Sequence, residues 1–155
     1  MNQIFEYIKS GTLDDIVKLI RNTPSAKDAK DERGFPAIVL AAYSNRSDIV
    51  SMLIEAGCDV NQLDAARNTA LMGVAFKGYV QIAEELIAAK SDIDHQNVQG
   101  ATALIYAAMF GHKDIAALLI DAGADCKIVD HNQKSAIDHA KEKNFLEMAT
   151  LLEKS

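Results

Sequence analysis

The segment GATALIYAAMFGHKDIAALLIDAGAD, residues 100–125, contains the pattern that decides the fold of this protein. Its first nine residues, 100–108, align without gaps with residues 34–42 and 67–75, so the chain contains three copies of this pattern. A Gly or Asn recurs at positions 11, 45, 78, 111 and 144, and successive positions differ by 34, 33, 33 and 33 (45−11, 78−45, 111−78, 144−111). A fixed period of this length is typical of stacked repeats, which bind along an extended surface and seldom carry a catalytic cleft.

Each copy predicts a helix, a tight turn, a second helix and an extended finger. Thr69, Thr102 and Ser135 are expected to cap the first helices, because their hydroxyls can accept an unpaired backbone N–H. The second segment of each copy carries apolar residues at helical spacing, which predicts one buried face. The recurring Gly or Asn fits a left-handed turn between helices. Gly57 and Gly123 are expected to end the second helices, with Lys90 as a weaker stop in the middle copy.

The pattern resembles the ankyrin-repeat family. The best copy runs from Thr102-Ala103-Leu104 through Ala107-Ala108, Gly111-His112, Ile115 and Leu118-Leu119 to Gly123-Ala124-Asp125. The resemblance covers essentially the whole chain and implies an all-α solenoid of stacked helix-turn-helix units with short β-hairpin-like fingers. The chain departs from the family at two places. The family proline is replaced by Ala37, Ala70, Ala103 and Ala136, and the family histidine by Val39, Met72, Ile105 and Asp138.

We predict one domain, residues 1–155, with repeats at about 1–30, 31–63, 64–96, 97–129 and 130–155. The first and last repeats are expected to be caps, because polar residues replace apolar ones on a face without a neighbour. Asp15 is such a residue, at the place where later copies have Ile49, Ile82 and Ile115. The extra residue of the first period is expected in the connection 22–33, which contains Pro24.

Composition argues against several classes of protein. The net charge of −6 disfavours a nucleic-acid partner, which requires a basic stripe. No stretch has the roughly 20 apolar residues of a membrane span, and residues 1–9 lack the features of a secretory signal. Cys58 and Cys126 lie two repeats apart, too far for a disulfide, and two unpaired thiols favour a cytoplasmic location.

The four histidines do not predict a reaction site. His112 occupies the turn between helices, where a structural role is expected. His95 and His131 lie on fingers near acidic residues, but no ligand set has a recognised metal spacing. His139 and Asp138 are neighbours on a helix and therefore point in different directions. We expect no catalytic residue, no metal and no cofactor, so the protein is predicted not to be an enzyme.

The family resemblance implies that first helices and finger tips line a concave groove. Tyr43, Phe76 and Met109 occupy the same slot of successive repeats and are expected to form a ladder across it. An exposed aromatic patch rimmed by charge is typical of an interaction site. The alternative is that these side chains fold onto the next repeat and seal the stack. The predicted partner-binding residues are Arg33, Phe35, Tyr43, Asn68, Phe76, Lys77, Val98, Met109, Phe110 and Lys143.

The function that we expect is a non-enzymatic module that binds a protein partner in this groove. Arg33, Lys77, Lys134 and Lys143 give the groove a partly basic rim, which would suit an acidic segment of the partner. Three alternatives stay open: an inhibitor or immunity-type protein that blocks an enzyme or toxin, a metal-dependent enzyme, and a homodimer through the concave face. A monomer is expected.

Overall fold

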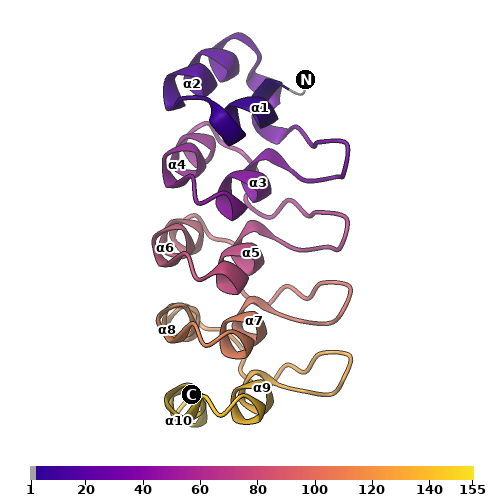
Figure 1. The fold of residues 1–155 in the computed structure, drawn as a ribbon, viewed down its shortest axis with the longest axis vertical. Coiled ribbons are helices and arrows are strands. Elements are labelled where there is room, and N and C mark those ends of the chain that lie inside the picture. The colour runs from indigo at the N-terminus through magenta and orange to yellow at the C-terminus, as the bar shows by residue number, and fades with distance from the viewer. Residues whose placement is uncertain (1–2) are drawn as a thin grey trace.

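The computed structural model describes residues 3–155, which form ten α-helices and one short 3₁₀ helix. The helices pair into five layers, stacked along one axis (Figure 1). They are α1 (Gln3–Ser10), α2 (Leu13–Asn22), η1 (Pro24–Asp28), α3 (Ala37–Tyr43), α4 (Ser47–Glu55), α5 (Ala70–Lys77), α6 (Val80–Ala88), α7 (Ala103–Met109), α8 (Lys113–Asp121), α9 (Ala136–Glu142) and α10 (Leu146–Glu153). The all-α solenoid is therefore confirmed. Met1 and Asn2, part of the segment considered as a signal, lie outside the described residues.

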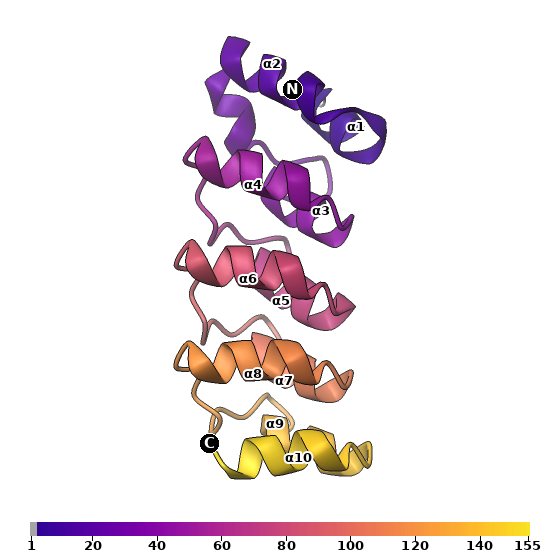
Figure 2. The same cartoon turned by 90° about the vertical axis from the view of Figure 1, so that its left-hand side faces the viewer.

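Two rows of helices run the length of the stack. The odd-numbered helices α3, α5, α7 and α9 pack on one another beside the projecting fingers, and the even-numbered helices form the other row (Figures 1 and 2). The fingers are hairpin-like but contain almost no regular strand; in residues 3–155 the isolated β-bridge joins Lys30 to Pro36. The connection predicted to hold the extra residue of the first period contains η1. The domain and repeat boundaries remain predictions.

The predicted caps begin the first helices of the later layers. The hydroxyl of Thr69 accepts the N–H of Met72 at 3.2 Å, and Thr102 and Ser135 act in the same way. Each bond satisfies a backbone donor that the helix leaves unpaired. Asp15 caps α2 together with Thr12, accepting the backbone N–H of Thr12 at 2.8 Å. Asp15 was predicted from its polarity to mark an end layer, and the structure shows that it also caps the start of α2.

The turns between paired helices use left-handed residues, with one exception. Asn45, Gly78, Gly111 and Asn144 have positive φ, as predicted. Gly11 does not, so the left-handed prediction is wrong there. A Cβ at Gly11 would lie 2.7 Å from Cα of Tyr7, so close approach of the backbone, rather than φ, requires glycine.

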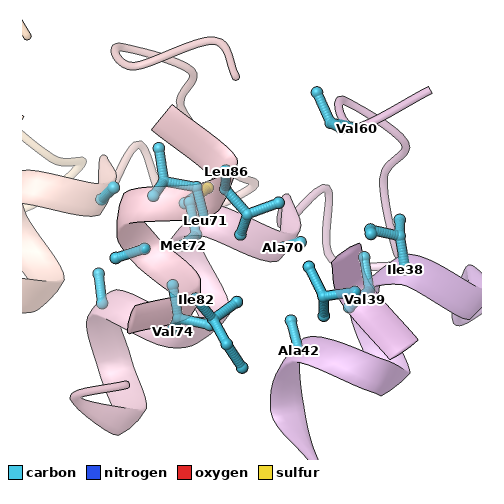
Figure 3. Packing of buried hydrophobic residues seen from close by; sticks show 14 of the residues in the cluster. Ile38, Val39, Ala42, Val60, Ala70, Leu71, Met72, Val74, Ile82 and Leu86 are labelled. Atoms are coloured by element: carbon cyan, nitrogen blue, oxygen red, sulfur yellow. The ribbon is translucent and has the colours of Figure 1, made fainter. Parts of the chain in front are cut away.

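The core is a continuous apolar layer between the rows of helices. Ala41 and Ala42 are fully buried, as are Ala107 and Ala108, which lets neighbouring layers approach closely. Figure 3 shows side chains of α3, α5 and α6 meeting in the middle of the stack. Those labelled include Ile38, Val39, Ala42, Val60, Ala70, Leu71, Met72, Val74, Ile82 and Leu86.

Hydrogen bonds between finger connections join neighbouring layers in the middle of the stack. Asn61 Oδ1 accepts the N–H of Asp92 at 2.8 Å, and Asp94 Oδ1 accepts the N–H of Asp125 at 2.9 Å. The separation in sequence is the same for both pairs (92−61, 125−94). The layers are therefore joined by a repeated polar contact as well as by the apolar core.

Candidate functional site

Three aromatic side chains meet near the ends of α5 and α7, and we call them the aromatic cluster: Phe76, Tyr106 and Phe110. The ring centroids of Phe76 and Phe110 are 4.6 Å apart with an edge-on geometry. The Phe76 ring also lies 6.2 Å from that of Tyr106. Phe76 is 40% exposed and Phe110 42% exposed, so the cluster stays open to solvent. Such edge-to-face pairing favours one arrangement of the rings.

A polar network holds the third ring of the cluster. The Asn97 side-chain amide donates to the Tyr106 hydroxyl at 2.8 Å and to Asn68 Oδ1 at 2.8 Å. Asn68 is one of the predicted site residues, and these bonds join it to the cluster through Asn97. Tyr106 was not predicted. It occupies the repeat position that Gly73 and His139 occupy in the neighbouring repeats. An aromatic residue at that position is the feature of the sequence that could have identified Tyr106 as part of the site.

Tyr43 behaves differently from Phe76, although both occupy the same slot of the repeat. A Cβ added at Gly73 would lie 2.8 Å from Cε2 of Tyr43, so the tyrosine ring fills the space left by the glycine. Burial raises the pKa of the Tyr43 hydroxyl, and the charge of Asp64 raises it further. Lys77 Nζ lies 5.8 Å from the Tyr43 ring centroid. Tyr43 thus packs onto the next layer, as the sealing alternative describes.

The other predicted site residues lie at three places. At the first finger, the guanidinium group of Arg33 lies over the ring of Phe35. The distance from its Cζ to the ring centroid is 4.9 Å. Val98 is 51% exposed on a later finger. Its backbone N–H donates to the carbonyl oxygen of Ala66 in the preceding finger. Met109, partly buried, and Lys143, exposed, lie at the turns between helices.

A hollow of about 330 Å³ borders the aromatic cluster. It lies between the turns of the last two layers and is lined by Phe110, Gly111, Lys113, Phe145, Leu146, Glu147 and Met148. Leu146 is 74% exposed, an unusual position for a large apolar residue. Leu146 was not among the predicted site residues. The feature that could have identified it is an apolar residue at the start of α10, because the matching first residue of α8 is Lys113.

Acidic or amide side chains shape the finger turns. Asp31, Asp64, Asn97 and Asp130 each accept two backbone N–H groups through one Oδ atom. Asp130 also holds His139, with 2.8 Å between Oδ2 and Nε2, and both residues are buried. Burial alone would raise the pKa of Asp130, but hydrogen bonds from His139, Lys134 and Asn132 outweigh it and lower the pKa.

The remaining histidines make structural contacts. His112 Nε2 lies 3.0 Å from the carbonyl oxygen of Phe76, which agrees with the predicted role at the turn. His95 Nε2 lies 2.8 Å from the carbonyl oxygen of Arg67, so it joins two fingers. Asp138 caps α9 through Ser135, while His139 points to Asp130, so the two neighbours do not pair. Within residues 3–155, no three His, Cys, Asp or Glu side chains gather in a way that could hold a metal ion.

The fold defines a class: a helical repeat protein built from helix-turn-helix layers with projecting fingers. The family model described as ankyrin repeats (3 copies) matches residues 4–97 and 71–155. The chain belongs to the ankyrin-repeat family, whose members are protein–protein interaction modules.

Two longer proteins resemble part of this chain. Inversin of Gallus gallus is 35% identical over 69 residues, which is 44% of this chain and 6% of Inversin. The NAD-capped RNA hydrolase NUDT12 of Homo sapiens is 37% identical over 68 residues, 42% of this chain and 15% of that protein. The chain thus spans a small part of the length of these relatives. Separately, none of the helices in the described residues is long and apolar enough to cross a membrane.

Proposed function

We propose that this protein is a non-catalytic module that binds a protein partner through the face carrying the aromatic cluster. The observation that carries the proposal is the exposure of Phe76 and Phe110, which pack against each other and still leave 40% and 42% of their surface open to solvent. Exposed aromatic side chains in an ordered cluster are the residues that dominate protein interfaces. The neighbouring hollow adds apolar surface to the same face.

Other properties support the same proposal. A net charge of −6 disfavours binding to nucleic acid. The free thiols of Cys58 and Cys126 suit the cytoplasm, where we place the protein. We propose that the five layers act as one domain and that the protein is a monomer. Light scattering that detects a dimer abolished by Phe76→Ala would show instead that a second copy covers the cluster.

A comparison of variants tests the proposed function. Wild-type protein and a Phe76→Ala/Phe110→Ala variant are used to capture proteins from a lysate of the native host, and the captured sets are identified by mass spectrometry. We expect at least one specific protein to be lost with the double variant. Leu13→Ala is the matched control, because Leu13 is 38% exposed on α2, away from the cluster. Identical captured sets for all three proteins would contradict the proposal.

A further inference from the structure

Two lysines flank the aromatic cluster at matched positions of the repeat. Lys77, Phe110 and Lys143 are separated by one full repeat each (110−77, 143−110), so they occupy matching places in three successive layers. Stacked helices pack at about 8–10 Å between axes. Along the stack, Phe110 therefore lies about one layer from Lys77 and about one layer from Lys143.

Both lysines are exposed and lack a carboxylate partner. Within residues 3–155, neither forms an ion pair, whereas other surface lysines do. Lys77 instead lies near the Tyr43 ring. Glu142, next to Lys143 in the sequence, pairs with Lys134 at 2.6 Å. The face around Phe110 thus presents unneutralised positive charge on a protein whose net charge is −6.

The surface beside Phe110 has room for a side chain. The hollow beside Phe110 has a volume of about 330 Å³. Phe145 and Leu146 line its other side, and its two charged lining residues, Lys113 and Glu147, pair with each other at 3.4 Å. Apolar surface in a concave site with few polar groups suits an apolar side chain of a binding partner. The combination of one apolar site and two flanking cations is complementary to an apolar residue flanked by two acids.

We propose that this surface binds an acidic, extended segment of a partner protein, with one apolar side chain at Phe110 and a carboxylate at each lysine. The proposal deepens the proposed function and rests on it. In a polyproline II conformation, residues i and i+3 share one edge and are about 9 Å apart, which matches the layer spacing. A β-strand would turn residue i+3 to the opposite side. The segment therefore carries an acid three residues before and three residues after its apolar residue.

Selection from a phage-displayed library of random twelve-residue peptides on the full chain tests this inference. We expect the selected peptides to carry Leu, Phe or Met with Asp or Glu three residues away on both sides. Lys77→Gln/Lys143→Gln should weaken their binding by about ten-fold, since two exposed ion pairs are lost. Lys77→Arg/Lys143→Arg should retain it. Lys90→Gln/Lys127→Gln, which removes the same charge elsewhere, should leave binding unchanged.

The contrary outcomes separate this inference from the proposed function. Peptides that require Phe76 and Phe110 but carry no acids would overturn the inference alone. Acids placed seven residues before and seven residues after the apolar residue, as a helical segment would place them, would also overturn the inference. Peptides that bind the Phe76→Ala/Phe110→Ala variant as well as wild type, or a selection that enriches no peptide, would overturn both. Circular dichroism of each variant verifies that the helices remain folded.

Discussion

Lys90 illustrates strain at a single residue. It adopts φ of 68° after α6, at the position that Gly57 and Gly123 occupy after α4 and α8. A residue with a Cβ disfavours this conformation by about 1–2 kcal/mol, while glycine loses more freedom on folding. We expect Lys90→Gly to raise the free energy of unfolding by about 0.5–1 kcal/mol in urea titrations.

The matched control for this substitution is Gly57→Ala. Its φ is 82°, and nothing lies within 4 Å of an added Cβ, so conformational strain is the expected effect of alanine there. That variant should be destabilised by about 1 kcal/mol. A loss of stability in Lys90→Gly would contradict the assignment of strain.

Asp130 makes the stability of the last layers depend on pH. The pKa of Asp130 is lowered in the folded protein, against about 3.9 in an unfolded chain. Its charged form therefore stabilises the fold fully above pH 4, and this stabilisation is lost as the pH falls through the folded pKa. Asp130→Ala removes the acceptor of two turn N–H groups and of His139, and should cost about 2–3 kcal/mol at pH 7.

Asp130→Asn separates the turn from the charge. Asn97 forms the same finger turn with an amide, so asparagine at 130 should keep the turn and cost less than alanine. The difference in free energy of unfolding between wild type and Asp130→Asn should shrink between pH 7 and pH 3. A difference that stays constant over this range would show that the charge of Asp130 contributes nothing.

At the scale of the helix, Tyr43 and Gly73 form a complementary pair across two layers. Alanine is favoured over glycine inside a helix by about 0.5–1 kcal/mol, but a Cβ at position 73 meets the Tyr43 ring. Gly73→Ala should therefore stabilise a Tyr43→Ala background by about 0.5–1 kcal/mol and stabilise wild type less. A double-mutant cycle by urea unfolding measures this coupling. Additive effects would show that Tyr43 does not depend on the glycine.

Helices, caps and most turns could be predicted from the sequence because their signals are local and repeated. The hydroxyl of Thr102 caps the helix that begins at the next residue, and the left-handed turn at Gly111 recurs at the matching position of other repeats. The φ of Gly11 could not be predicted, because glycine also serves where two segments of backbone approach closely, here at Tyr7.

The candidate site was harder to predict than the fold. The family resemblance implies exposure at the repeat positions of Phe76 and Phe110, and both side chains are exposed in the structure. The orientation of Tyr43 depends on the missing side chain of Gly73, which belongs to the next repeat. The part played by Tyr106 depends on Asn97 of the same repeat, whose amide also reaches Asn68 of the preceding repeat. Contacts between layers therefore decide which side chains of the same slot are exposed.

At the scale of the whole molecule, each layer depends on its neighbours. Asp94→Ala removes the acceptor that holds Asp125 of the next layer, and should cost about 1 kcal/mol. Because the contact joins the last two finger connections, α9 and α10 should lose protection while α3 and α4 keep theirs. Hydrogen exchange of the backbone amides measures this difference. Equal loss of protection in all layers would contradict nearest-neighbour coupling.

The most direct test of the account is the affinity of a captured partner for the Phe76→Ala/Phe110→Ala variant, measured by isothermal titration calorimetry beside wild type and Leu13→Ala. The account predicts a dissociation constant at least about 30-fold higher for the double variant, because central aromatic residues contribute about 2 kcal/mol or more. Leu13→Ala should bind like wild type. A double variant that remains folded and binds within about two-fold of wild type, less than about 0.5 kcal/mol, would contradict the assignment of this face as the binding site.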